Sequence, residues 1–195
     1  MKTVFVDVDT QIDFLFPAGA LYVPGAERLL PAIAHLNQFA AAQGIPLIST
    51  TDAHSEDDPE FRQWPPHCVA GTTGQLKPRE TLAANQIIVE KQVLDVFANP
   101  GFPALLESLG ADRYVVYGVA TEYCVRCAVT GLLGTGKQVA LVTDAIAAVN
   151  AADGARTLEE FTARGGTLTT VAEATKEAGR TEVHPGTLNG APRAT

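Results

Sequence analysis

The chain has 195 residues, of which 46% are hydrophobic, and its formal net charge is -8. This length suits one α/β domain, and the hydrophobic fraction is enough to bury a core without disulfides or a structural metal. The acidic charge disfavours nucleic acid and anionic membranes as partners, because both reward a basic face. The N-terminal segment MKTVFVDVDT is unlike a secretion signal, and no run approaches the roughly 18 apolar residues of a membrane helix.

Three cysteines, Cys68, Cys124 and Cys127, are too few for a disulfide framework in a chain of this length. Reduced thiols are the simpler interpretation, and we therefore predict a cytoplasmic protein.

Strand-like and helix-like segments alternate along the chain. In chain order, we predict a strand at 3–8, a helix at 26–43, strands at 46–51 and 86–90, a helix at 103–109, a strand at 113–119, a helix at 124–133, a strand at 137–143, a helix at 154–164 and a strand at 167–171. Continuously apolar strands between helices indicate a three-layer α/β/α domain around a six-stranded, mainly parallel sheet, and we assign it residues 1–174.

Two segments depart from this alternation. Residues 53–80 form a long loop rich in Pro, His, Asp and Glu, and loops of this length inside a domain are usually functional. Residues 175–195 are polar and rich in Gly and Pro, so we predict a C-terminal tail that could pack on a partner subunit of a homo-oligomer.

Ligands of parallel sheets bind outside the carboxyl ends of the strands, so the residues that follow each strand are the candidates for chemistry. The first strand leads into Asp9, the second into Asp52 and His54, the third into Lys91, and the fourth into Cys124 after a short turn. Four strand ends therefore deliver carboxylates, an imidazole, an ammonium and a thiol to one edge.

Cys124 is the candidate nucleophile, because a thiolate at the start of a helix is stabilised by backbone N–H groups. Asp9 is the candidate general acid and base, and Asp7, which strand alternation places on the same face, competes with it. Lys91, placed between Asp9 and Cys124, would favour the charged form of each. Each residue also has a structural alternative: Cys124 as a buried core cysteine, Asp9 as a turn cap and Lys91 as a solvated lysine. We interpret Asp13 as a turn cap.

The long loop supplies a candidate metal site. Asp52 and His54 share one face of an extended segment, His67 follows a stiff Pro-Pro pair, and Glu60 is a candidate fourth ligand. Imidazole and carboxylate ligands suit zinc, iron or manganese at a catalytic site, although two histidines in an acidic loop can also be surface residues.

Other titratable residues carry weaker signals. His35 and His184 are unremarkable, and Asp144 either backs the site or caps a turn.

The motifs resemble those of the isochorismatase-like cysteine hydrolases. The segment DTQIDF from Asp9 resembles the family's opening signature, and GVATEYCV at residues 118–125 is similar to its nucleophile motif, with Glu122 where Asp is usual. Lys91 falls in the expected interval, and the resemblance spans about residues 3–172.

Within that family, the Asp52-x-His54 pair and the segment WPPHCVAGT at residues 64–72 resemble the nicotinamidase (pyrazinamidase) branch. One position departs from it: Glu60 stands where many members carry a histidine, and Asp57 or Asp58 could substitute, so the fourth ligand stays open. The resemblance implies a bound divalent metal ion, zinc first and iron or manganese as alternatives.

The resemblance also implies a cis peptide between Val119 and Ala120, which would aim the N–H groups of Ala120 and Cys124 into an oxyanion hole. It implies hydrolysis of nicotinamide, and of pyrazinamide, to the acid and ammonia through a thioester, without an organic cofactor. Phe14, Trp64 and Tyr123 are candidates to pack on the substrate ring.

Three alternatives remain open at this point. The first is an amidase of the same family that acts on another small carboxamide. The second is a thiol oxidoreductase that uses the C-x-x-C of Cys124 and Cys127. The third is a metal- or ligand-binding protein without catalysis, since a fold does not fix a function.

Overall fold

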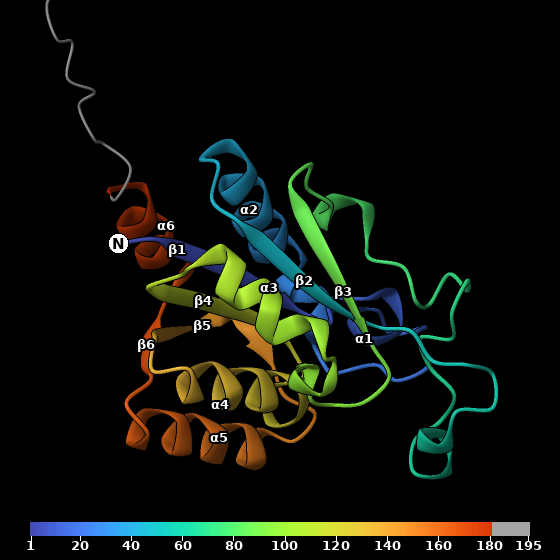
Figure 1. Cartoon of the computed structure of the whole chain (residues 1–195). Coiled ribbons are helices and arrows are strands. Elements are labelled where there is room, and N and C mark those ends of the chain that lie inside the picture. Colours follow the sequence, from blue (N-terminus) through green and yellow to red (C-terminus); the bar gives the residue numbers. More distant parts are fainter. Residues whose placement is uncertain (181–195) are drawn as a thin grey trace, which may run out of the picture.

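Six strands form one sheet in the order β3-β2-β1-β4-β5-β6, and every pairing in it is parallel. The computed structural model describes residues 1–180 (Figure 1). The strands are β1 (Thr3–Val8), β2 (Leu47–Asp52), β3 (Gln86–Lys91), β4 (Arg113–Val119), β5 (Gln138–Ala147) and β6 (Thr167–Thr169). The predicted three-layer fold is confirmed, and the strand order reverses between β1 and β4, where doubly wound sheets bind ligands.

Helices cover both faces of the sheet (Figure 1). They are α1 (Ile12–Leu15), α2 (Leu30–Ala42), α3 (Gly101–Leu109), α4 (Arg126–Gly134), α5 (Ala151–Ala163) and α6 (Val171–Arg180). One core joins the sheet to α2 and α6 through Leu36 and Ala174, and a second joins it to α3, α4 and α5 through Phe102, Leu132 and Phe161.

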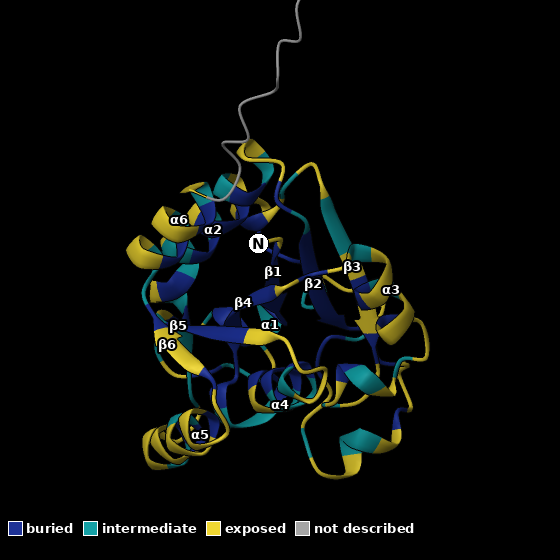
Figure 2. Cartoon of the chain, turned by 60° about the vertical axis from the view of Figure 1, so that its left-hand side comes forward, coloured by how far each residue is buried: buried dark blue, intermediate teal, exposed yellow. Residues whose placement is uncertain are grey.

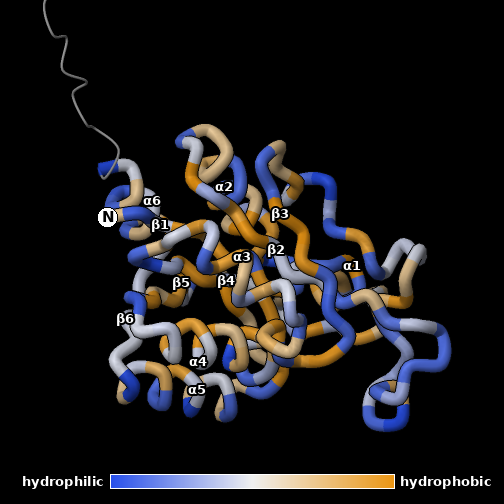
Figure 3. The backbone as a smooth tube through the Cα atoms, viewed as in Figure 1, coloured by the Kyte–Doolittle hydropathy of each residue, from blue (hydrophilic) through white to orange (hydrophobic). Residues whose placement is uncertain are grey.

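Burial and hydropathy agree with this layering. Every residue of β1 and β4 is buried, and the helices turn their exposed faces outward (Figure 2). Hydrophobic stretches of backbone run along the strands of the sheet (Figure 3). In the part of the chain that the structure describes, no helix has the length and apolar character needed to cross a membrane.

Some boundaries differ from the sequence-based prediction. The helix expected at 26–43 begins as a 3-10 turn (Ala26–Leu29) before α2, and the one expected at 124–133 follows a π-helical turn, η5 (Thr121–Val125). The start of the tail is also wrong, because 175–180 belong to α6, where Ala174 and Ala178 are buried at helical spacing. Residues 181–195 lie outside the described part, so tail packing on a partner stays a prediction.

The sheet brings the candidate residues together at its carboxyl edge. Asp52 and Lys91 are register partners at the ends of β2 and β3. On the other side of β1, a side chain on Gly118 would place its Cβ 2.0 Å from the carbonyl oxygen of Val8. The glycine therefore lets β4 run close to β1 just before Asp9, which brings the segment after β4 to the same edge.

Candidate active site

Lys91 lies at the centre of a buried cluster. Its ammonium nitrogen Nζ is 2.8 Å from Oδ2 of Asp9, donates to Sγ of Cys124 at 3.5 Å, and contacts Oδ1 of Asp52. All four residues are buried. The structure thus places the predicted acid/base, ammonium and nucleophile in direct contact, each from the end of a different strand or the turn after it.

The backbone of Asp9 separates it from Asp7. Asp9 has a φ of 49°, which is uncommon outside glycine, and it turns the side chain toward β2, where the Thr50 hydroxyl donates to Oδ1 at 2.6 Å. Asp7 instead accepts from Ser49, the neighbour of Thr50 and thus on the opposite face of β2. The expectation that Asp7 and Asp9 face the same way is therefore wrong, because strand alternation ends at a residue with positive φ.

Burial sets the charge states of the cluster. It raises the pKa of the Cys124 thiol and of the Asp9 carboxyl, against the lowering effect of the Lys91 ammonium. Burial lowers the pKa of Lys91, but the Asp9 carboxylate and Cys124 outweigh it and keep that pKa well above its ordinary value. The cluster therefore holds a permanent ammonium beside a thiol and a carboxyl that can exchange a proton.

The turn that carries Cys124 follows directly from β4. The peptide bond between Val119 and Ala120 is cis, and the carbonyl oxygen of Ala120 accepts from the N–H groups of Tyr123 and Val125 at 3.1 and 3.2 Å. Cys124 lies within the π-helical turn rather than in the first regular turn of a helix, which corrects the predicted boundary.

A second group lies next to the first. Donor atoms of Asp52, His54 and His67 all lie within 4.8 Å of one another, and all three residues are buried. The two imidazoles direct Nε2 toward Oδ2 of Asp52, at 3.7 Å from His54 and 3.9 Å from His67. Their Nδ1 atoms are engaged elsewhere, with Asp58 at 3.0 Å and with the Pro65 carbonyl at 2.8 Å.

This group fits a divalent metal ion. Nε2 of His54 is buried without a hydrogen-bond partner, and such orphaned atoms are rare in folded proteins. Ligating histidines usually hold their other ring nitrogen in a hydrogen bond, which is the arrangement of both His54 and His67. Two imidazoles, a carboxylate and a neighbouring pocket suit a catalytic rather than a purely structural ion.

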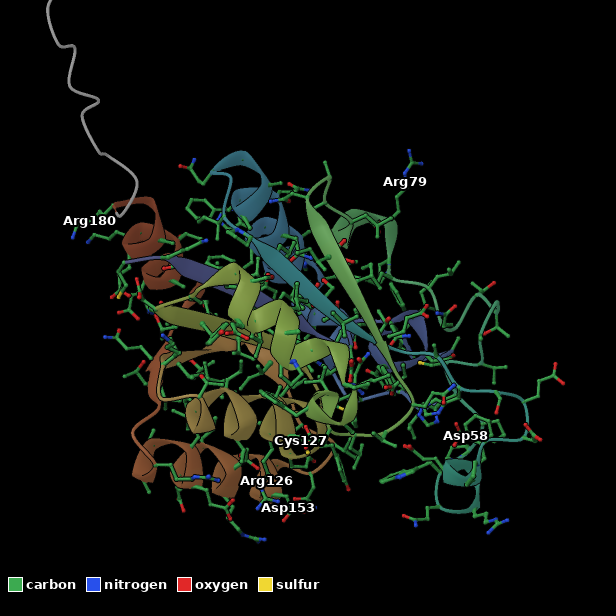
Figure 4. All side chains as sticks on the ribbon, in the orientation of Figure 1. Asp58, Arg79, Arg126, Cys127, Asp153 and Arg180 are labelled. Carbon is green, nitrogen blue, oxygen red and sulfur yellow. The ribbon has the colours of Figure 1, made fainter. Side chains whose placement is uncertain are left out.

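The three candidates for a fourth metal ligand, Glu60, Asp58 and Asp57, differ in their position relative to the pocket. Glu60, in the 3-10 turn Pro59–Arg62, lines the pocket beside Asp52 and His67, and burial raises the pKa of its carboxyl. Asp58 accepts from the far nitrogen of His54, so it orients that ring, and Asp57 is exposed. Figure 4 shows Asp58 in the loop that projects beyond the sheet edge. Glu60 is therefore the best placed of the three.

A cavity of about 80 Å³ opens beside both groups. The predicted ring-packing residues Phe14, Trp64 and Tyr123 all line it; Trp64 meets Tyr123 edge-on at 5.3 Å between ring centroids, and Phe14 lies 5.5 Å from the ring of His67. Its other lining residues are Leu21, Tyr22, Val23, Asp52, Glu60, His67, Leu94, Val119, Ala120, Cys124 and Val149.

The apolar members Leu21, Tyr22, Val23, Leu94 and Val149 were not predicted from the sequence. They lie in connecting segments without periodicity, so no pattern distinguishes them from other loop residues.

The remaining candidates lie away from the cluster or support it. The carboxylate of Asp13 accepts from the backbone of Ala20 at 3.0 Å and of Cys68 at 2.7 Å, consistent with a structural cap. Asp144 caps the start of α6 through the N–H of Val171 at 2.8 Å. His35 is exposed on α2, and His184 lies outside the described residues.

Comparison with known proteins agrees with the geometry. The sequence matches the Isochorismatase domain family over residues 3–173. It is 30% identical to the nicotinamidase/pyrazinamidase of Mycobacterium tuberculosis, over 79% of this chain and 91% of that protein. The pyrazinamidase of Pyrococcus horikoshii in complex with zinc has a TM-score of 0.82 at 30% identity, covering 87% of this chain and 99% of that one.

A third relative adds a ligand. The structure of PnC1 from L. infantum in complex with nicotinate has a TM-score of 0.80 at 30% identity, covering 88% of this chain and 93% of that one. The family match spans nearly the whole described chain and includes every residue of the two groups above. The chain belongs to the isochorismatase family.

Proposed function

We propose that this protein is an amide hydrolase that converts nicotinamide to nicotinate and ammonia, with pyrazinamide as a second substrate. One observation carries the proposal: Asp52 contacts Lys91 of the thiol cluster and faces the two histidines of the metal group, beside a pocket walled by aromatic rings. Nicotinamidase and pyrazinamidase relatives support the same substrate class.

The pocket itself favours a small, neutral ring. Its volume of about 80 Å³ is far below the several hundred Å³ of sites for larger ligands. Among the described residues that line it there is no lysine or arginine, whereas Asp52 and Glu60 are acidic. Most of the other lining side chains are aromatic or aliphatic, so an uncharged aromatic carboxamide fits best.

The thiol cluster supplies acyl transfer. Asp9 takes the proton of Cys124, and the thiolate beside the Lys91 ammonium attacks the carboxamide carbon. The N–H groups of Ala120 and Cys124 are the proposed donors to the oxyanion. Asp9 then returns the proton to the departing nitrogen, so that ammonia leaves and a thioester remains on Sγ.

Hydrolysis of the thioester uses the same residues. Asp9 removes a proton from water, the resulting hydroxide attacks the thioester carbon, and the C–S bond breaks. The proton on Asp9 returns to Sγ, which restores the starting thiol and releases the acid. Lys91 keeps its charge throughout, so it balances whichever of Asp9 and Cys124 is ionised.

Asp52, His54 and His67 would hold the metal ion, with Glu60 as the proposed fourth protein ligand. A bound divalent ion would act as a Lewis acid that accepts the ring nitrogen of the substrate. Zinc is the proposed ion on the chemistry of the donor set, with iron and manganese as alternatives. The protein's own contribution is to fix both imidazoles through Asp58 and Pro65.

The test is ammonia release from nicotinamide by the full chain supplied with zinc or manganese. We expect turnover by wild type, none by Cys124→Ala, and little change in Cys127→Ser, a matched thiol that is half-buried one turn away at the start of α4 (Figure 4). Benzamide, which lacks the ring nitrogen, should react far more slowly. An inactive wild type with metal present would refute the substrate assignment.

The same variants separate the alternatives. Burial raises the pKa of Cys127, which leaves a poor partner for thiol–disulfide chemistry. A thiol oxidoreductase would lose its activity in Cys127→Ser, whereas an amidase keeps it. Activity on aliphatic amides but not on nicotinamide would favour another amidase of the family.

A further inference from the structure

A buried ion pair lies beneath the candidate site, on the face of β1 opposite to Asp9. Nζ of Lys77, which comes from the long loop between β2 and β3, lies 2.8 Å from Oδ2 of Asp7. Their side chains are 3% and 0% exposed. A charge pair so completely removed from water is costly to form, so its presence calls for a reason beyond stability.

The network around this pair leaves few polar groups unpaired. Oδ1 of Asp7 accepts from the Thr10 hydroxyl at 2.7 Å, and Oδ2 also accepts from Asn37 of α2 at 2.8 Å and from Ser49 of β2 at 3.1 Å. Lys77 contacts the Thr10 hydroxyl as well. The Lys77 ammonium, although it comes from a surface loop, is therefore held in a buried polar site formed by β1, β2 and α2.

Lys77 ends a loop segment, residues 66–77, that carries a proposed metal ligand near its start. His67 stands at its start, and residues 70–73 between the two are exposed, so this stretch has little apolar burial to fix it. Hydrogen bonds to the segment that follows β1 hold it instead: Cys68 N–H donates to Asp13 at 2.7 Å, and the Gln11 amide donates to the Gln75 carbonyl at 2.7 Å.

We propose that Lys77 and Asp7 are positioning residues for the metal site. The ion pair anchors the far end of segment 66–77 on the sheet, and this anchor keeps the imidazole of His67 directed at Asp52. Neither residue contacts the site. The inference rests on the proposed function through the metal ligands alone and not through the choice of substrate.

The experiment measures zinc affinity of the metal-stripped full chain, by competition with a chromophoric chelator, and hydrogen exchange of residues 66–76. Lys77→Met should weaken zinc binding by about tenfold, in the range for residues that orient metal ligands, and speed exchange of the segment. Lys77→Arg keeps the charge and should recover most of the affinity. The double variant Asp7→Asn/Lys77→Met leaves no unpaired buried charge and should still bind zinc weakly.

A matched control separates anchoring from general loss of stability. Nη1 of Arg113 pairs with Glu177 at 2.5 Å with its side chain 9% exposed, at the start of β4 and hence at the opposite end of the sheet. Arg113→Met removes a largely buried cation without touching segment 66–77, and should leave zinc affinity and the exchange of that segment unchanged.

Zinc affinity decides the inference, and nicotinamide turnover serves only to separate its outcome from that of the proposed substrate. Wild-type zinc affinity in both Lys77→Met and the double variant would overturn the inference, and so would zinc uptake that is absent in wild type. If wild type binds zinc, Lys77→Met binds it weakly, and neither hydrolyses nicotinamide, the anchor stands and the proposed substrate fails.

Discussion

The carboxylate of Asp52 contacts the ammonium of Lys91 through one oxygen and turns the other toward the histidine pair. Burial raises the pKa of this carboxyl, but Lys91 and His54 outweigh it and bring the pKa below its ordinary value. Asp52 is therefore ionised at neutral pH and belongs to both groups at once. The thiol cluster and the metal group are parts of a single electrostatic unit.

This shared carboxylate predicts an asymmetry between two ligand variants. Asp52→Asn should lower metal affinity at least tenfold, and at saturating metal its kcat should remain about 100-fold low, because Lys91 also loses a charged partner. His67→Ala should lose metal affinity but regain a larger share of kcat when metal is added. Metal titration of ammonia release checks both; equal recovery by the two variants would contradict the shared role.

Metal binding should depend on pH. Burial lowers the pKa of His54, but Asp52 and Asp58 outweigh it and raise that pKa to about 9 in the metal-free protein. Below that pH the ion must displace a proton, so affinity should rise by about tenfold per pH unit and level off near pH 9. Chelator competition at several pH values measures this slope, and a flat profile would count against His54 as a ligand.

The raised pKa of His54 also makes the stability of the metal-free chain depend on pH, but in the opposite direction: stability falls as pH rises. A histidine whose pKa is higher in the folded state stabilises it fully below the unfolded pKa of about 6.5. That contribution is lost as pH rises through about 9. We expect the Tm of the metal-free protein to fall over this pH window. Asp58→Asn should lower the pKa of His54 and so make this fall in Tm smaller.

The acid limb of the pH–rate profile should report Asp9. Burial raises its pKa above the ordinary 3.8, with Lys91 opposing the rise. Only the ionised carboxyl can take the thiol proton, so kcat/KM should fall as pH drops through this raised value. Lys91→Gln removes the opposing charge and should move the limb by roughly 1–3 units to higher pH. A limb that stays in place would assign the proton transfer elsewhere.

The aromatic wall predicts an effect on KM. Trp64 and Tyr123 meet edge-on and both line the cavity. Trp64→Ala should raise KM for nicotinamide about tenfold, as expected for loss of one ring contact of about 1 kcal/mol and the cavity left behind, with little change in kcat. Trp64→Phe should lie between. A change confined to kcat would show that Trp64 acts on the reaction step.

The sequence predicts strand ends better than the directions of side chains. Alternation of apolar strands and helices is enough to bring Asp9, Asp52, Lys91 and Cys124 to one edge, because parallel strands all point the same way. It cannot predict the positive φ of Asp9, which decides whether Asp7 or Asp9 meets the thiol.

The long loop limits prediction in a different way. Its residues have no periodicity, so neither the burial of Lys77 nor the role of Asp58 as a partner of His54 leaves a pattern in the sequence. Glu60 could be proposed as a ligand only from its spacing. Tertiary contacts with β1 and α2 fix this segment, and they become visible only in three dimensions.

The lysine of the site stands on the outermost strand. Among the described strands β3 pairs only with β2, and its outward residue Ile88 is 46% exposed. Peripheral strands detach more easily than central ones, because fewer contacts hold them. Mild urea should therefore detach β3 and displace Lys91 from the site while β1 and β4 stay folded. Enzymatic activity would then be lost at lower urea than the rest of the fold.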